Sequence, residues 1–317
     1  MRKKLQVHQV ASSSSDRKMG WVRWVISAVI ILAVGGFVYS DYKKSQVAGS
    51  PYRYNLVLAE ESGEVAFVSF DPEEKQVFAI PYPKNLEIKS RSVGTYRIEN
   101  LYKLGSYEGS PGLFVKRKVQ GFMRVPVAGY LETQANGSLK QGLTRGVAKA
   151  IWDTSGTSLS KLDAIILLQR LNAYEWREAS NEELVRAGVI KQGGESYQYS
   201  HERLKQYLGA RVFDWSVGES NITVAVINGS GEDGLGNDIA EFLSNLGFDV
   251  VAVKGLAGDE KREQTTLIYS LRERGKVESV LLLFAELFGW QEAASGSTDE
   301  YRADLIVTLG TDAEDLF

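Results

Sequence analysis

Basic side chains that could hold a phosphate group are concentrated in one stretch of this chain. Arginine can bind a phosphate or pyrophosphate through two parallel hydrogen bonds, and lysine adds a mobile positive charge. These residues could line a groove for an anionic ligand, such as a phosphate-bearing lipid or glycan, or they could be the commoner scattered charge of a protein surface. The set comprises Arg91, Arg97, Lys103, Arg117 and Lys118.

Carboxylates and tyrosines in the same region could serve a ligand in other ways. Glu60, Glu61 and Glu64 form an acidic group beside a predicted strand end. Because carboxylate oxygens bind divalent cations such as Mg²⁺, this group is either a cation site or a solvated loop. Tyrosine rings can stack on sugars or pack half-buried against a core. Both interpretations apply to the tyrosines spaced five or six residues apart, Tyr96, Tyr102 and Tyr107.

A glycine-rich segment follows a predicted strand later in the chain. Residues 229–234 fit the G-x-G-x-x-G pattern of dinucleotide-binding loops. Two acids, Glu232 and Asp233, occupy the place where a pyrophosphate would approach, and Lys254 and Gly255 replace the acid that binds a ribose. We therefore expect a glycine turn that lets a helix and a strand pack closely, in preference to a nucleotide site.

Composition excludes several kinds of chemistry. The 317 residues contain no cysteine, so disulfide bonds and thiolate metal sites are impossible. Only two histidines, His8 and His201, are present, which argues against a histidine metal cluster and a Ser-His-Asp triad. The 37 basic and 40 acidic residues give a net charge of -3. This balance argues against a nucleic-acid partner, because neutralising phosphates requires a surplus of Lys and Arg.

A membrane-spanning helix is predicted near the N-terminus. The 17 uncharged residues at 24–40 reach the lower limit for crossing a bilayer, with Trp21, Trp24 and Tyr39 at the edges where aromatic rings favour the interface. Six basic residues precede this segment and two follow it closely, so the N-terminus is expected in the cytoplasm. A cleaved signal peptide is the alternative, but the long, serine-containing region ahead of the segment favours a retained anchor.

The candidate site residues must be positioned by a strand-rich region that follows a polar linker at 41–52. The turn Asp71-Pro72-Glu73 joins two of its strands into a hairpin. Thr157 or Ser158 would cap one helix, and Ser180 and Ser200 would cap two shorter ones that end at Gly188 and Gly209. Strands are predicted at 54–58, 65–70 and 76–80, and longer helices at 113–123, at 139–152 and from 162 onward.

The sequence changes character at residue 221. An apolar run at 222–227, a helical apolar stripe at 235–246 and a second buried strand at 248–253 predict a βαβ unit with a right-handed crossover. A small α/β domain is completed by strands at 266–269 and 305–309 and by a helix near 277–288.

This last region resembles the C-terminal domain of LytR-type envelope proteins. The resemblance lies in VAVINGSG at 224–231, GLGNDIAEFLSNLGFDVV at 234–251 and ADLIVTLGTD at 303–312. The preceding region resembles a divergent LytR–CpsA–Psr domain, through residues 63–83, Tyr96–Asn100 and Val125–Tyr130. In that family the domain follows an N-terminal anchor and moves a glycopolymer from a polyprenyl-pyrophosphate carrier to the cell wall. The resemblance therefore implies arginines that clamp the pyrophosphate and acids that hold Mg²⁺.

The chain departs from the family where that chemistry is centred. Tyr82-Pro83 follows Ile80-Pro81 in the place of an Arg-Asp pair, and no later arginine-x-arginine motif is found. Glu64 takes the place of a family aspartate and could still bind a metal, and Arg97 replaces a lysine. Losing charged contacts to a transition state costs roughly 3 kcal/mol each, or orders of magnitude in rate. We therefore expect catalysis to be lost.

These patterns predict a bacterial, single-pass membrane protein of mixed α/β fold. It has a cytoplasmic tail (1–20), a transmembrane helix (21–40), a linker (41–52), a divergent LytR–CpsA–Psr-like α/β domain (53–216) and a small βαβ-containing C-terminal domain (221–317). The two domains are expected outside the cytoplasmic membrane, binding a polyprenyl-linked glycan, a wall polymer or a partner protein. Arg91, Arg97 and Arg117 are the candidate anion-binding residues. The alternative is an active glycopolymer phosphotransferase that uses Mg²⁺, Glu64 and Arg97. A purely structural module is a third hypothesis.

Overall fold

The computed structural model describes residues 53–90, 94–134, 137–212, 221–256, 261–270, 288–292 and 296–316, together with scattered positions in 24–48 and 275–284. Residues 46–317 form one compact unit. Most of the predicted membrane segment and of the linker lies outside the described residues. Within the described part of the chain, no helix is both long enough and apolar enough to cross a membrane.

A five-stranded sheet forms the centre of the first region, with the strand order β6-β1-β2-β3-β7. Its three middle strands are antiparallel, and each edge strand runs parallel to its neighbour. The predicted strands and their hairpin are confirmed, with the Asp71 carboxylate accepting hydrogen bonds from the turn amides of Glu73 and Glu74. The strands are β1 (Tyr54–Glu60), β2 (Val65–Asp71), β3 (Gln76–Pro81), β6 (Gly129–Thr133) and β7 (Glu175–Glu178).

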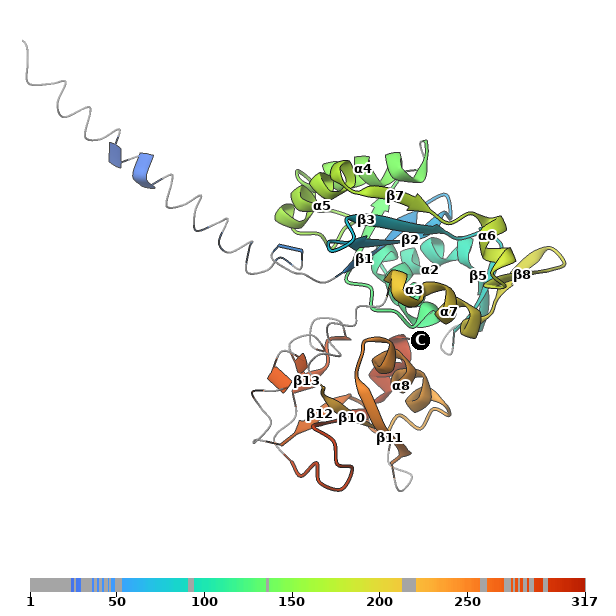
Figure 1. The fold of residues 1–317 in the computed structure, drawn as a ribbon, viewed down its shortest axis with the longest axis vertical. Helices are drawn as coiled ribbons and strands as arrows, with labels where there is room; N and C mark the ends of the chain where they lie inside the picture. Colours follow the sequence, from blue (N-terminus) through green and yellow to red (C-terminus); the bar gives the residue numbers. More distant parts are fainter. Residues whose placement is uncertain are drawn as a thin grey trace, which may run out of the picture. The chain divides into compact units, whose positions relative to one another are not determined.

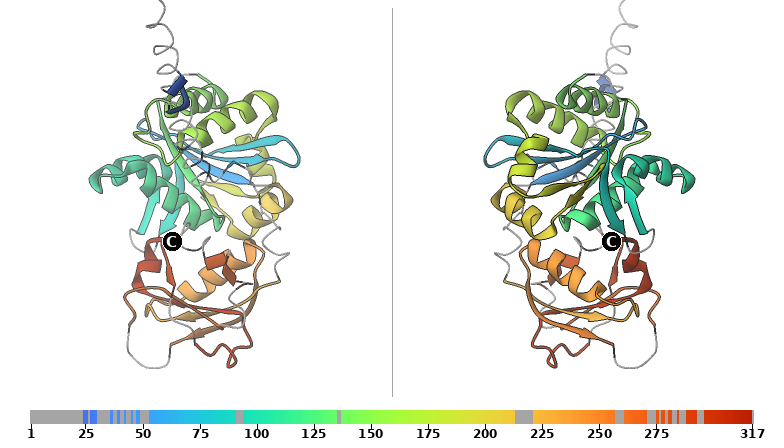
Figure 2. Two further views of the ribbon diagram at one scale, coloured as in Figure 1. Left: turned by 90° about the vertical axis from the view of Figure 1, so that its left-hand side faces the viewer. Right: turned by 90° about the vertical axis from the view of Figure 1, so that its right-hand side faces the viewer.

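Helices cover both faces of this sheet, so that the region has three layers (Figures 1 and 2). Alternate residues of a strand point to opposite faces. Accordingly, Val57 and Ala59 belong to one core cluster, and Leu56 and Leu58 belong to the other. The first cluster includes side chains of α2 (Leu101–Tyr107) and α3 (Pro111–Met123), and the second includes those of α4 (Leu139–Ala150) and α5 (Lys161–Ala173).

The predicted cap of α5 is wrong by two to three residues. Ser160, and neither Thr157 nor Ser158, caps this helix by accepting a hydrogen bond from the Asp163 amide. The two earlier hydroxyl groups are used elsewhere, because Thr157 Oγ1 donates to the Tyr130 carbonyl and Ser158 Oγ accepts from the Tyr130 amide. The loop before α5 is thereby held against β6.

A second sheet of four strands packs against the first core cluster, and the sequence patterns did not predict it. Its order is β5-β4-β9-β8, and Leu86, Ile88 and Ile190 contribute buried side chains to that cluster. Ser180 caps α6 as predicted, and regular helical geometry breaks at Gly209 within α7. The elements are β4 (Leu86–Ser90), β5 (Gly94–Arg97), η1 (Ile98–Asn100), α6 (Asn181–Arg186), β8 (Ile190–Gly193), β9 (Ser196–Tyr199) and α7 (His201–Val212).

The C-terminal region contains the predicted βαβ unit. β10 (Thr223–Asn228) and β11 (Asp249–Gly255) pair in parallel, and α8 (Leu235–Asn245) connects them. The sheet order is β11-β10-β14-β12-β13, in which β12 runs antiparallel to β14. Most of the predicted helix near 277–288 lies outside the described residues. The remaining elements are β12 (Thr266–Tyr269), β13 (Gln291–Glu292), β14 (Leu305–Leu309) and η4 (Thr311–Leu316).

Two glycines one turn apart on α4 provide a matched test of how closely this helix approaches the sheet. A methyl group on Gly146 would come within 2.6 Å of Thr133 Cγ2 and 2.8 Å of Leu131 Cδ2, whereas one on Gly142 meets only Glu60 Oε1 at 3.9 Å. We expect Gly146→Ala to lower the free energy of unfolding by roughly 1–3 kcal/mol. Gly142→Ala should raise it by up to about 1 kcal/mol through helix propensity. Urea unfolding measures both, and equal effects would contradict this packing.

Candidate ligand-binding site

Two neighbouring cavities lie at one edge of the central sheet and share Gly142 in their walls. The first, which we call the polar cleft, has a volume of about 520 Å³ and lies at the carboxyl ends of the parallel strands β1 and β6. The second, the inner pocket, has a volume of about 390 Å³ and lies between the end of β3 and the start of β2. The inner pocket is lined by Tyr82-Pro83 and Glu64, the positions that the sequence resemblance aligns with a charged pair and an aspartate of LytR–CpsA–Psr proteins.

Tyr82 belongs to the hydrophobic core and does not offer a charge to the inner pocket. Its side chain is buried, its ring contacts Phe122 edge to face at 5.2 Å, and its hydroxyl donates to Met123 Sδ at 2.7 Å. Burial raises the pKa of Tyr82 well above its ordinary value. The residue is therefore neutral and held by packing, and Pro83 beside it has no ionisable group.

Carboxylates outnumber cations around the inner pocket. Glu60, Glu64 and Glu178 line it, with Lys84 as the basic residue among its lining residues. Lys84 Nζ lies 3.3 Å from Glu64 Oε1 and also donates to the Ser62 carbonyl. A pyrophosphate entering here would meet an excess of negative charge, which disfavours its binding.

The same carboxylates do not form a magnesium site. Glu60 is buried and accepts hydrogen bonds from the Ser62 and Thr133 hydroxyl groups, and Glu64 is exposed and paired with Lys84. Among the described residues, no group of three or more acidic or histidine side chains could hold a metal ion. The residues present therefore do not fit the Mg²⁺ that a catalytic site of the family would use.

The basic residues predicted to bind an anion are not gathered at these cavities. Arg97 ends β5, and its guanidinium lies 3.8 Å from the Glu99 carboxylate. Arg117 is exposed on α3, whereas Lys118 is buried with its ammonium 5.7 Å from the Phe114 ring centre. Neither Arg97 nor Arg117 lines the polar cleft or the inner pocket, and Arg91 lies outside the described residues.

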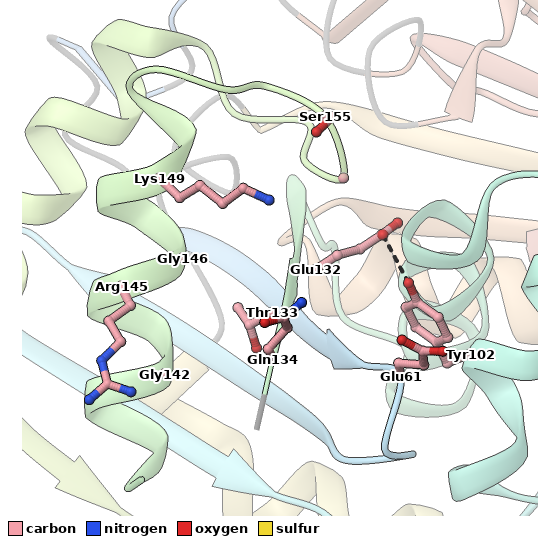
Figure 3. Close-up of a pocket in the computed structure, with 11 residues that line it drawn as sticks. Glu61, Tyr102, Glu132, Thr133, Gln134, Gly142, Arg145, Gly146, Lys149 and Ser155 are labelled. Carbon is pink, nitrogen blue, oxygen red and sulfur yellow. Dashed lines mark hydrogen bonds between the residues drawn. The ribbon is translucent and has the colours of Figure 1, made fainter. Parts of the chain in front are cut away.

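The polar cleft holds one rigidly placed carboxylate. Glu132 Oε2 accepts from the Tyr102 hydroxyl at 3.1 Å (Figure 3). Its Oε1 accepts from the amide of Gly112, in the first turn of α3, at 2.9 Å. A negative charge is favourable at a helix N-terminus, which strengthens this arrangement. Sequence analysis selected Tyr102 but missed Glu132, because the contact joins residues 30 apart. Of the other two tyrosines, Tyr96 packs partly buried against the core and Tyr107 is exposed.

Helix α4 supplies the positive charge of the polar cleft. Arg145 and Lys149 lie one turn apart and line it together with Glu61 and Glu132, and the Lys149 ammonium lies 3.5 Å from the Asp153 carboxylate in an exposed pair. Figure 3 shows Lys149 extending from α4 toward the side of the cleft where Glu132 and Tyr102 lie. Sequence analysis missed both cations, because only the packing of α4 on the sheet determines which face of the helix is exposed. Cations, carboxylates, hydroxyls and amides in one cleft suit a ligand rich in hydroxyl groups that also carries an anionic group.

The glycine-rich loop at 229–234 satisfies its own polar groups. Ser230 is buried and donates from Oγ to Asn228 Oδ1, while the Asn228 amide donates to the Glu232 carbonyl. A methyl group on Gly236 would come within 3.2 Å of Asn228 Cβ and 3.3 Å of Val253, so helix α8 packs closely on both strands. These contacts agree with the glycine-turn interpretation.

The polar cleft raises the pKa of Tyr102 to about 12, through burial first and then through the charge of Glu132 and the hydrogen bond to it. We expect Glu132→Gln to lower this pKa, which NMR of ring-labelled tyrosine can measure, with Tyr107→Phe as a control that leaves the Tyr102 signal in place. Since the folded-state pKa exceeds the ordinary value of 10.0, this group's contribution to stability falls as the pH rises from about 10 to about 12. An unchanged Tyr102 pKa in the Glu132 variant would contradict the contact.

Substitutions of Tyr82 test whether its side chain belongs to the core. The arginine found at this place in LytR–CpsA–Psr proteins would put a charge there. We expect Tyr82→Phe to lower the free energy of unfolding by about 1 kcal/mol, the loss of one hydrogen bond. Tyr82→Arg should lower it by roughly 3–5 kcal/mol, because the guanidinium would be buried without a partner. Urea unfolding measures both changes. An arginine variant as stable as the parent would contradict the burial of this side chain and would show that a charge here reaches solvent through the inner pocket.

The C-terminal region matches a known protein family. Residues 221–312 match the family described as "LytR cell envelope-related transcriptional attenuator", which confirms the LytR-type domain expected from the sequence. No curated protein matches the chain.

Among solved structures, similar ones include TagT from Bacillus subtilis (12% identity, 49% of this chain and 87% of that chain, TM-score 0.33) and TagU from the same organism (11% identity, 49% and 93%, TM-score 0.34). A third is the LytR-CPS2A-psr family protein YwtF (TagT) with bound octaprenyl pyrophosphate lipid (12% identity, 49% and 86%, TM-score 0.33). LytR–CpsA–Psr proteins are among the structures to which this chain is similar.

Proposed function

We propose that this chain is a cell-envelope protein that binds a glycan-containing ligand without chemically transforming it. The match of residues 221–312 to an envelope-related family supports the compartment. The uncharged segment at 24–40 and its basic N-terminal flank support an anchor with residues after about 41 outside the cytoplasm. In this proposal the 53–216 domain binds the ligand, and the 221–317 domain accompanies it on the same side of the membrane.

The burial of Tyr82 is the observation that carries the non-catalytic part of the proposal. The position where the family resemblance calls for charge is filled by a neutral ring in the core. Around it, the inner pocket has more carboxylates than cations, and Glu64 is already paired with Lys84. Among the described residues, a transition state with developing charge on phosphate would find neither a preorganised cation clamp nor a set of metal-binding side chains there.

The polar cleft is the proposed binding site. Its volume of about 520 Å³ lies within the range of cavities that hold small ligands, roughly 300–1,000 Å³. Glu132 is fixed by two hydrogen bonds and can accept from sugar hydroxyl groups, while Lys149 can bind a phosphodiester or carboxylate. A wall polymer or lipid-linked glycan that combines sugars with anionic groups matches this set of partners.

The proposal predicts that a cation of the cleft contributes to affinity and that a cation outside it does not. We expect Lys149→Ala to weaken the binding of anionic wall-glycan fragments to the full chain in detergent by about 10–100-fold, the loss of one charge-assisted hydrogen bond of roughly 1.5–3 kcal/mol. The matched control is Arg117→Ala, which removes an exposed charge that lines neither cavity and should leave affinity unchanged. Calorimetric titration gives both values. Equal losses in the two variants, or no binding by the parent chain, would refute the site.

A further inference from the structure

The chain enters the first domain at a fixed point on α5. Val47 is 0% exposed, its amide donates to Asp163 Oδ1 at 3.1 Å, and its carbonyl accepts from the Arg170 guanidinium at 3.3 Å. Asp163 is itself buried and accepts a hydrogen bond from the Ser160 hydroxyl. Both backbone groups of Val47 are thus bound by side chains of one helix, so the chain is attached to α5 at this residue.

This docking shortens the tether between the domain and the proposed membrane anchor. The predicted segment ends at residue 40, which leaves residues 41–46 to span the gap. Six residues reach at most about 20 Å when fully extended. The surface of α5 near Val47 is therefore held within that distance of the bilayer surface. This step rests on the anchoring proposed above.

The end of α4 and the beginning of α5 lie together at the β6 edge of the sheet. Gly146 of α4 packs against Leu131 and Thr133 of β6, and Thr157, in the loop before α5, pairs with Leu131. Residues at the end of α4, in this loop and in the first turns of α5 are therefore neighbours. The docked Val47 is bound through Asp163 in the first turn of α5, at the same end of the helical layer.

Apolar side chains are exposed at this end. Trp152 is 86% exposed directly after α4, and Ile165 is 41% exposed on α5. On helix α5, Ala164, Leu167 and Leu171 fill the core, whereas Ile165 faces solvent between the exposed Lys161 and Gln169. Single exposed apolar residues are common on soluble proteins. Here, however, they coincide with the point where the chain arrives from its proposed anchor, and tryptophan favours the headgroup layer of a bilayer.

The charge of this helical layer suits an anionic surface. Residues 139–173, from the start of α4 to the end of α5, contain the five basic residues Lys140, Arg145, Lys149, Lys161 and Arg170 and the two acidic residues Asp153 and Asp163, a net charge of +3. The whole chain has a net charge of -3. Basic residues near an anionic leaflet are attracted to it by about 1 kcal/mol each. Lys161 is exposed at the start of α5, beside the apolar pair.

We infer that the outer end of the α4–α5 layer lies against the membrane surface, with Trp152 and Ile165 at the boundary between headgroups and acyl chains. Lys161 then faces anionic headgroups. In this orientation Lys149, on the last turn of α4, lies close to the headgroup layer. The polar cleft that Lys149 lines is therefore close to the headgroups too. A lipid-linked glycan could therefore occupy the cleft while its lipid remains in the bilayer, which narrows the ligand of the proposed function to a membrane-borne one.

The absence of cysteine makes a direct test possible. Nitroxide labels are attached to the single-cysteine variants Trp152→Cys and Ile165→Cys of the full chain in vesicles containing anionic lipid. The control is Tyr107→Cys, a 78% exposed position on α2, in the helical layer on the other face of the sheet. We expect oxygen to relax the labels at 152 and 165 several-fold more effectively than a polar nickel reagent does, and the reverse at 107. Lys161→Glu should weaken this difference in anionic but not in zwitterionic vesicles.

Two results would overturn the inference. They differ in whether they also contradict the proposed membrane anchor. If the chain floats with the vesicles but the labels at 152 and 165 match the control at 107, the membrane-facing orientation is wrong and the anchor stands. If the chain does not float with the vesicles at all, both the orientation and the proposed anchoring are wrong. The Ile165→Cys variant retains Trp152. If only the label at 152 fails to contact the bilayer, the removal of the tryptophan explains the loss, and the orientation is not wrong.

Discussion

Burial of the central sheet on both faces is the constraint on which the rest of the first domain depends. Every residue of β1 and β2 is buried, and successive side chains along these strands belong alternately to the core clusters on the two faces of the sheet. An acyl chain between the sheet and either helical layer would need space that these side chains fill, including that of Phe67 and Phe78 on one face and Phe70 on the other. Ligands are therefore directed to the ends of the strands, where the chain turns and polar side chains emerge.

The two cavities at the strand ends, the inner pocket and the polar cleft, differ in charge. This difference bears on two roles that a single site could combine, binding a ligand and catalysing its reaction. At the inner pocket, Tyr82 is part of the core, and Glu60, Glu64 and Glu178 outnumber the single cation Lys84 among the lining residues. At the polar cleft, Glu132 is held by Tyr102 and Gly112, and α4 supplies the positive charge. The chain thus has a polar cavity next to a buried, uncharged position. This combination supports the proposal of binding without turnover.

Much of the architecture could be predicted because local patterns determine it. The apolar run of β10, the stripe of α8 and the Leu-Gly-Phe that precedes β11 specify a βαβ unit without knowledge of the remainder of the chain. The hairpin of β2 and β3 follows from its Asp-Pro turn. The four-stranded sheet was missed, since its strands are short and β4 pairs with β9 more than 100 residues later. The cap of α5 was misassigned because Thr157 and Ser158 hydrogen-bond to a distant strand.

The site was harder to predict than the fold for a related reason. Sequence analysis grouped basic residues that are near one another along the chain, such as Arg97 and Arg117, but the structure does not bring them into either cavity. The cations that line the cleft, Arg145 and Lys149, are separated by more than 40 residues from Tyr102 and look like ordinary surface charges of a helix. The Tyr82-Pro83 departure pointed to the inner pocket, because it was judged against a family pattern and did not depend on spacing. Of the residues selected from the sequence, Glu61 and Tyr102 line the polar cleft.

Binding without turnover can be tested by incubating the full chain in detergent with Mg²⁺ and a glycan linked to polyprenyl pyrophosphate, and measuring the release of polyprenyl pyrophosphate or phosphate. We expect a saturable complex and no release above the uncatalysed rate. Mg²⁺-dependent turnover that Arg97→Ala abolishes would contradict this expectation and would establish a rearranged phosphotransferase site instead.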